Sequence, residues 1–161
     1  MALSQEKRRD RQLKMLAVAE GLIRQGPGAG GFSMGQLAAA AGVSPATPYN
    51  LLGTKADILA LIVRAEFDRF EARLEDIPPA SALDRLRSAT SAVVAQYTAD
   101  RAFYQGLYSA TMTVEDNDVR RLMGSAGHQL WEALVKAAIE SGQLAPWVRA
   151  RPFTDMLLRM I

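Results

Sequence analysis

Residues 33 to 55 carry hydroxyl, amide and ammonium side chains of the kinds that contact nucleic acids. Thr47 and Asn50 are short polar residues, which a recognition helix presents from its first turns to base edges. Tyr49 and Lys55 supply a hydroxyl and an ammonium group, which fix a protein on phosphates without reading sequence. The full set of predicted DNA contacts comprises Arg8, Arg9, Ser33, Ser44, Thr47, Tyr49, Asn50, Thr54 and Lys55.

Two short helices separated by a tight turn are predicted around these side chains. Ser33 and Gln36 have the S-x-x-Q spacing of a capping box, in which each side chain bonds the other residue's backbone N–H. Gly42 follows a Leu-Ala-Ala-Ala-Ala run and favours the left-handed conformation that ends a helix. We expect Ser44 to cap a second helix with Pro45 in its first position, where a missing N–H costs nothing. The spacing predicts a helix-turn-helix.

A third helix is predicted to begin at Thr54, with Asp57 in the capping-box position and an apolar run beyond it. Pro48 is unusual because it lies four residues after the Ser44 cap. There it would remove a backbone hydrogen bond and bias Thr47 away from helical geometry. The sequence therefore predicts a strained or 3₁₀-like first turn in the second helix.

A first helix is predicted upstream, with an apolar stripe of Met15, Leu16, Ala19, Leu22 and Ile23. Basic residues gather just before and within it, namely Lys7, Arg8, Arg9, Arg11 and Lys14. Residues 1 to 55 carry seven Lys or Arg against three acids, whereas the rest of the chain carries twelve against fourteen. Two interpretations have equal weight: a solvated helix start, or a mobile arm that places Arg8 and Arg9 on DNA.

The loop at residues 26 to 31 reads GPGAGG and formally matches G-x-G-x-x-G. A dinucleotide-binding loop must follow a strand and begin a helix inside a βαβ unit. Because a helix precedes this loop, we interpret the match as coincidental and expect no phosphate site there.

The spacing of the residues in the two predicted short helices resembles the signature of the tetracycline-repressor (TetR) family of bacterial transcription regulators. The matching positions are Ser33, Leu37-Ala38, Gly42-Val43-Ser44, Thr47, Tyr49, Thr54-Lys55, Asp57 and Ile58. Pro48, Leu51 and Leu52 depart from it, since an aliphatic residue, His and Phe are usual there. The resemblance is specific over residues 12 to 59, and it implies that Tyr49 and Lys55 contact phosphates.

The resemblance also implies an all-α fold with two domains. Residues 1–56 would form a three-helix DNA-binding domain, and residues 57–161 a helical bundle that binds an effector and dimerises. The chain stops inside an amphipathic stretch where members of the family usually continue. The second domain is therefore predicted to be truncated at its carboxyl end, which puts dimerisation by the usual surface in question. Exposed apolar surface is predicted at Phe153, Met156, Leu157 and Met160.

Helical periodicity continues through the carboxyl-terminal half. The helix from residue 54 is expected to end at Pro78-Pro79, and Ser81 with Asp84 forms the capping pair of the next helix. A shorter helix is predicted over 101–112, a longer one ends at Gly142, and another begins near residue 152. The acidic turn at 115–118 lacks EF-hand spacing, so we expect it to stabilise a helix start and not to bind a cation.

Aromatic and methionine side chains are the candidates for an effector pocket in this half. They are Phe103, Tyr104, Tyr108, Met112, Met123 and Trp131. Such residues at helical spacing also form ordinary cores, so a packing role is the alternative at each position. His128 is the single histidine, and without further ligands at suitable spacing it predicts neither a metal site nor a sensor.

Composition excludes several classes of protein. No run approaches the ~20 apolar residues of a membrane helix, and the amino terminus lacks a signal-peptide core. The chain has no Cys, which excludes disulfides and thiolate chemistry. These observations predict a cytoplasmic protein without a cofactor.

The favoured function is a ligand-responsive repressor that binds a palindromic double-stranded DNA operator as a homodimer and releases it when a small effector binds. An all-helical enzyme is the rival, but the chain lacks H-E-x-x-H, G-x-S-x-G and a phosphate loop in the right context. The other alternative is a helical small-molecule binding protein with a non-functional DNA module, based on Pro48 and the few base-reading side chains.

Overall fold

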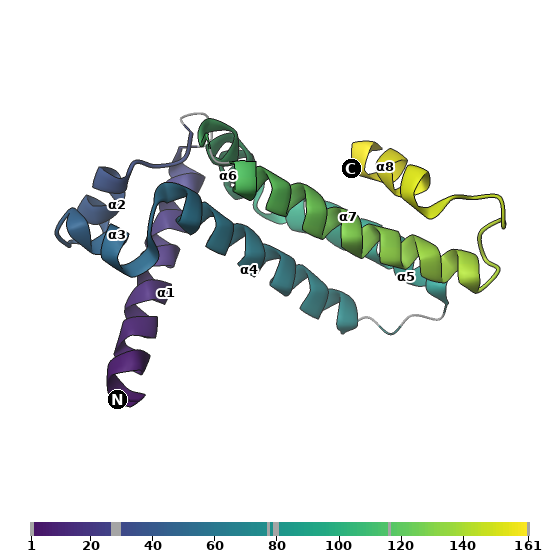
Figure 1. Cartoon of the computed structure of the whole chain (residues 1–161), viewed down its shortest axis with the longest axis horizontal. Coiled ribbons are helices and arrows are strands. Elements are labelled where there is room, and N and C mark those ends of the chain that lie inside the picture. The colour runs from purple at the N-terminus through teal and green to yellow at the C-terminus, as the bar shows by residue number, and fades with distance from the viewer. Residues whose placement is uncertain (1, 27–29, 77, 79–80, 116, 161) are drawn as a thin grey trace. The chain divides into compact units, whose positions relative to one another are not determined.

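The computed structural model describes residues 2–26, 30–76, 78, 81–115 and 117–160. Within these ranges every regular element is an α-helix (Figure 1). The helices are α1 (Ala2–Gln25), α2 (Met34–Ala40), α3 (Ala46–Leu52), α4 (Lys55–Glu75), α5 (Ala82–Ala99), α6 (Arg101–Thr113), α7 (Asn117–Glu140) and α8 (Ala150–Met160). The all-α fold expected from the sequence is confirmed.

The helices form two compact units. Met1–Arg64 and Asp100–Arg120 make up the first, and Ala65–Ala99 and Arg121–Ile161 the second. The first unit therefore includes α6, which lies outside the DNA-binding domain predicted for residues 1–56. The division of the chain into functional domains at residue 56 stays a prediction.

The core of the first unit draws on the apolar faces of its helices. Met15, Ala19 and Ile23 of α1 are buried, as their helical spacing predicts, together with Leu37 of α2 and Ile58 of α4. Burial of an aliphatic side chain the size of Leu or Ile stabilises the fold by about 1.5–3 kcal/mol. α1 is the central helix of this unit, because it packs against α2, α3 and α6.

α6 packs against α1 at very short range. A Cβ atom at Gly106 would lie 2.3 Å from the Ile23 carbonyl oxygen, so no residue with a side chain fits there without movement. Asp100 caps α6 through the Phe103 N–H (3.2 Å), and its second carboxylate oxygen accepts from Arg24 Nε of α1 (2.7 Å). The Arg24 guanidinium also lies 4.7 Å from the centroid of the Phe103 ring, a cation–π distance.

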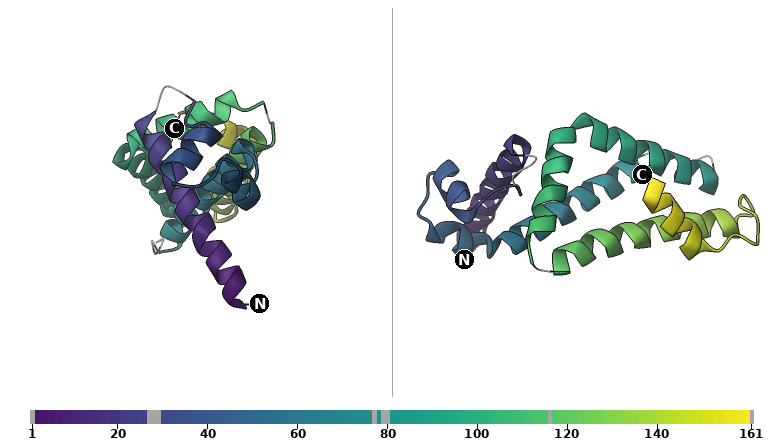
Figure 2. Two further views of the ribbon diagram at one scale, coloured as in Figure 1. Left: turned by 90° about the vertical axis from the view of Figure 1, so that its left-hand side faces the viewer. Right: turned by 90° about the horizontal axis from the view of Figure 1, so that it is seen from above.

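The second unit has an apolar core shared by α4, α5 and α7. Its buried members are Phe70, Leu74, Leu86, Ala89, Trp131, Leu134 and Val135. After α7 the chain turns back, so that α8 lies next to α7 (Figure 2) and Phe153 and Leu157 pack against this core. The prediction of exposed surface at these two residues is wrong, because they lie on the inner face of α8. Met156 is 46% exposed, as predicted, and the Met160 side chain lies outside the described residues.

Helix ends in the second unit follow the predicted capping. The Asp84 N–H donates to Ser81 Oγ (3.1 Å), whose hydroxyl donates back to Asp84 Oδ2 (2.7 Å). Gly142, two residues after the end of α7, has φ of +72°, and α4 ends at Glu75, shortly before the prolines. Among the described helices, none combines the length and the apolar character needed to cross a lipid bilayer.

Candidate nucleic-acid interface

α2, the turn after it and α3 form the helix-turn-helix. The Gln36 N–H donates to Ser33 Oγ (3.1 Å), and the Ser33 N–H donates to Gln36 Oε1 (2.8 Å), which is the predicted capping box. Gly42 has φ of +64°, and the N–H groups of Gly42 and Val43 bond to α2 carbonyls at 3.1 and 3.0 Å. This pair of bonds is a Schellman motif, so the predicted corner at Gly42 is confirmed.

α3 begins one residue later than the sequence predicts. Its N-cap position is taken by Pro45, and its first residue is Ala46, so the predicted cap at Ser44 is wrong. The Ser44 hydroxyl bonds instead to the Thr47 hydroxyl (2.9 Å). This side-chain hydrogen bond competes with a capping bond between the Ser44 hydroxyl and a backbone N–H of α3. The Thr47 N–H donates to the Ser44 carbonyl (2.9 Å), three residues back. The predicted 3₁₀-like first turn is therefore present.

Pro48 shifts the start of α3. It lacks the N–H that would bond the Ser44 carbonyl four residues back, and that carbonyl accepts from the Thr47 N–H instead. The expected loss of the first helical hydrogen bond is consistent with an α3 that begins at Ala46. The Pro48 ring is fully buried, so it acts as an apolar packing residue on the inner side of α3.

The outer side of α3 carries the side chains predicted to contact DNA. Tyr49 is 53% exposed, and Asn50 is also exposed. Thr47 is half-buried, with its hydroxyl committed to Ser44. Val43, in the turn before α3, is exposed and adds an apolar group of the kind that contacts the thymine methyl. Asn50 is thus the most available base-reading side chain on α3.

A long-range hydrogen bond fixes the orientation of α3. Gln12 Nε2 of α1 donates to the carbonyl oxygen of Leu51 near the end of α3 (2.8 Å). Leu52, the last residue of α3, is buried. No local sequence signal indicates Gln12, because its partner is 39 residues away.

The start of α4 is capped as predicted, but Lys55 has an unexpected partner. The Thr54 N–H donates to Asp57 Oδ2 (2.7 Å), and the Asp57 N–H donates to Thr54 Oγ1 (3.2 Å). Lys55 Nζ donates to the Gly30 carbonyl oxygen (2.7 Å) and lies 5.6 Å from the centroid of the Phe32 ring. Partial burial lowers the pKa of Lys55 from its ordinary value. The ammonium group predicted to bind phosphate is therefore held by the loop that precedes α2.

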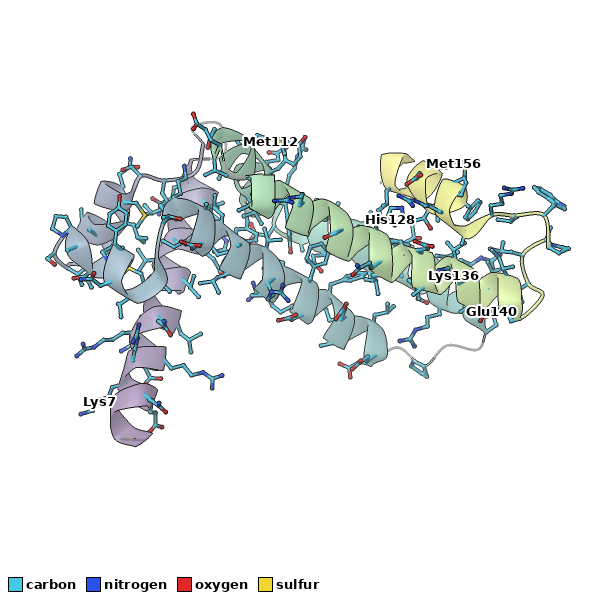
Figure 3. All side chains as sticks on the ribbon, in the orientation of Figure 1. Lys7, Met112, His128, Lys136, Glu140 and Met156 are labelled. Atoms are coloured by element: carbon cyan, nitrogen blue, oxygen red, sulfur yellow. The ribbon has the colours of Figure 1, made fainter. Side chains whose placement is uncertain are left out.

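The basic residues near the amino terminus lie on a helix. α1 is already helical at Ala2, and Lys7, Arg8 and Arg9 are exposed on it. Lys7 projects outward from α1 (Figure 3). Of the two interpretations of this cluster, the structure favours the solvated helix over the mobile arm. DNA contacts at Arg8 and Arg9 stay a prediction.

The residues predicted to bind an effector are divided between the two units. Those on α6, in the first unit, are Phe103, Tyr104, Tyr108 and Met112. Phe103 is buried, and Tyr104 is half-buried with its ring edge-on to Phe103 at 5.1 Å between centroids. Tyr108 and Met112 are 61% and 44% exposed. Phe103 therefore has a packing role beside α1, and effector binding by this set stays a prediction.

α7 carries the remaining predicted effector residues and the histidine. Trp131 belongs to the core of the second unit, and the Met123 side chain lies outside the described residues. His128 Nε2 is 2.9 Å from Asp155 Oδ1 of α8, and its Nδ1 is 3.4 Å from Glu132 Oε2, so it connects the two helices. In the part of the chain that the structure describes, no cluster of three or more metal-binding side chains occurs.

No family model and no curated protein matches this chain at a significant level. Solved structures do match it. The transcriptional regulator FadR from Bacillus subtilis, in complex with stearoyl-CoA, aligns with a TM-score of 0.75 and 18% identity over 91% of this chain and 80% of that one. The fatty acid degradation regulator FadR from Bacillus halodurans aligns with a TM-score of 0.73 and 16% identity over 93% of this chain and 79% of that one. SCO3833 from Streptomyces coelicolor A3, a TetR-family regulator, aligns with a TM-score of 0.59 and 23% identity over 91% of this chain and 73% of that one.

The chain has the fold of TetR-like transcriptional regulators. At 16 to 23% identity the likeness establishes the fold and no individual contact. The TetR-like fold agrees with the motif spacing over residues 33 to 58.

Proposed function

We propose that this chain is a DNA-binding transcriptional regulator whose α3 reads base edges in a palindromic operator. The observation that supports this most directly is the two-sided character of α3. Tyr49 and Asn50 face solvent, whereas Pro48 and Leu52 are buried, and Gln12 holds the end of the helix. A short helix with polar groups presented outward and a fixed orientation meets the needs of groove recognition.

The side chains around α3 divide into two chemical roles. Asn50 can form the paired hydrogen bonds to N6 and N7 of adenine that distinguish this base in the major groove. Ser33, Tyr49 and Thr54 can donate hydroxyl hydrogen bonds to phosphates, which orient the protein without reading sequence. The exposed basic residues of α1 add long-range attraction to the same polyanion.

A homodimer and a small effector complete the proposal. Two copies of α3 about 34–36 Å apart would contact successive major grooves, which requires a palindromic operator. Since FadR of B. subtilis was solved in complex with stearoyl-CoA, a long-chain acyl-CoA is the first effector class to test. In this proposal the protein acts in the cytoplasm as a repressor, and effector binding releases the operator by favouring a conformation with low DNA affinity.

Selection of duplexes from a random DNA pool tests the proposal. The wild-type chain should enrich a palindrome. Asn50→Ala should weaken binding by about 1–3 kcal/mol and relax the preference at one base position, because a bidentate base contact is lost. Tyr49→Phe should weaken binding to all sequences alike. Tyr97→Phe is the matched control, because Tyr97 is 54% exposed, close to the 53% of Tyr49, but lies on α5 in the second unit.

Effector response is measured on the selected palindrome with stearoyl-CoA, free stearate and CoA alone. Release by the acyl-CoA only would support the proposed effector class. A folded wild-type chain that enriches no duplex would refute DNA recognition, and acyl-CoA binding by that same chain would favour a small-molecule binding protein.

A further inference from the structure

The loop residues Gly30, Gly31 and Phe32 form a corner that lies against α6. Gly30 and Gly31 have φ of +70° and +82°, a backbone region that other residues rarely adopt. A Cβ atom on Gly31 would lie 2.7 Å from Ala110 Cβ, and one on Gly30 would lie 3.0 Å from Thr113 Cγ2. The corner therefore sits as close to α6 as its backbone allows, and the position of α6 determines where the corner can lie.

The same corner holds the ammonium group of Lys55. The Gly30 carbonyl oxygen accepts from Lys55 Nζ at 2.7 Å, and Lys55 Nζ also lies 5.6 Å from the centroid of the Phe32 ring. A lysine ammonium has three donors, so one is committed to Gly30 and two stay available for a phosphate. A flexible lysine side chain normally loses rotamer freedom when it binds, and here the corner restricts that freedom in advance.

We propose that the corner formed by Gly30, Gly31 and Phe32 positions the Lys55 ammonium for a DNA phosphate, and that α6 sets this position through Ala110 and Thr113. The inference rests on the proposed function. It assigns a role to the carboxyl-terminal part of the GPGAGG loop, which the helix-turn-helix does not otherwise use. It also makes Gly31 a positioning residue, which acts on DNA through Lys55. Charged hydrogen bonds to phosphate are short, about 2.7–2.9 Å, so a displacement of the corner by one ångström removes the contact.

The test is the salt dependence of binding to the palindrome selected by the wild-type chain. Each neutralised phosphate contributes about 0.9 to the slope of log Kobs against log salt. Lys55→Met should reduce the slope by about that amount, and Gly31→Ala should reduce it equally although it removes no DNA-facing group. Gly31→Ala in the Lys55→Met chain should have no further effect. Ala110→Gly in the Gly31→Ala chain removes the methyl group that the new Cβ would meet, and should restore the slope.

Gly142→Ala is the matched control. Gly142 also has positive φ, at +72°, but a Cβ there would have no neighbour within 4 Å, so it carries the backbone strain without the contact. The slope of log Kobs against log salt for Gly142→Ala should equal that of the wild type. Circular dichroism verifies that each variant folds, and Gly30→Ala is the milder substitute if Gly31→Ala does not.

A second readout requires no DNA. In an NMR titration of ¹³C-labelled lysine, Gly31→Ala should raise the pKa of Lys55 toward its ordinary value, because the ammonium is no longer partly buried. An unchanged pKa would overturn the inference. The inference would also be overturned if Gly31→Ala bound the palindrome with the wild-type salt slope. It would be overturned too if the reductions in slope caused by Gly31→Ala and Lys55→Met added in the double variant. A wild-type chain that selects no duplex would instead refute the proposed function, and this inference with it.

Discussion

Substitution of Gly106 by alanine tests how closely α6 packs against α1. The new Cβ would lie 2.3 Å from the Ile23 carbonyl oxygen and 2.9 Å from Ile23 Cγ2. An ordinary contact of this kind needs more than 3 Å, so the two helices must separate by roughly 1 Å, and overpacking of this size costs about 1–3 kcal/mol. Alanine recovers about 0.5–1 kcal/mol because it favours a helix more than glycine does. We therefore expect a net loss of about 1 kcal/mol.

Gly21→Ala is the control for Gly106→Ala, since Gly21 lies within α1 and a Cβ there would meet nothing within 4 Å. It should stabilise the first unit by about 0.5–1 kcal/mol. Both tryptophans, Trp131 and Trp147, belong to the second unit, so their fluorescence does not report on α1. Native-state hydrogen exchange of the α1 and α6 amides measures the free energy of opening of these two helices. If Gly106→Ala slows exchange as much as Gly21→Ala does, the close packing of α6 on α1 is refuted.

Further predictions concern caps, titration and core packing. Ser33→Ala should lower the free energy of unfolding by about 1 kcal/mol in urea titrations, because the capping box is lost, and Ser33→Thr should retain most of it. A hydrogen bond from Lys136 lowers the pKa of Glu132, so this carboxylate stabilises the fold above about pH 4.5 and loses that effect as pH falls through its folded pKa. Lys136→Met should therefore raise the pKa of Glu132 in an NMR titration and make the fold less sensitive to acid. Trp131→Ala should destabilise the second unit by about 3–5 kcal/mol, whereas Trp147→Ala, at an 81% exposed position, should change stability by less than about 0.5 kcal/mol, both measured by circular dichroism in urea.

Helix starts were predictable because their signals are local. Ser33 and Gln36 are three residues apart, as are Thr54 and Asp57, so each capping pair is visible in a short window of sequence. The start of α3 was misplaced because two hydroxyls, on Ser44 and Thr47, bond to each other, and a pattern of caps does not show which partner a hydroxyl takes.

The contacts that support the candidate interface were not predictable, because they join distant parts of the chain. Arg24 and Asp100 are 76 residues apart, and Lys55 and Gly30 are 25 apart. Periodicity identifies the buried face of a helix but not the helix that covers it. Residue type and position are therefore enough to propose Lys55 as a phosphate ligand, which stays a prediction, whereas the carbonyl that holds its ammonium group is visible only in the structure.

The packing of α6 on α1 has a consequence for the order of events during synthesis. The first unit is discontinuous in sequence, so after Arg24 the ribosome must add the 76 residues from Gln25 to Asp100 before α6 can dock. At typical translation rates this takes about 4–15 s, during which the side of α1 destined for α6 has no covering helix. The nascent chain therefore presents an incomplete first unit to the crowded cell for seconds, and the speed at which α6 arrives influences how much of the protein escapes aggregation.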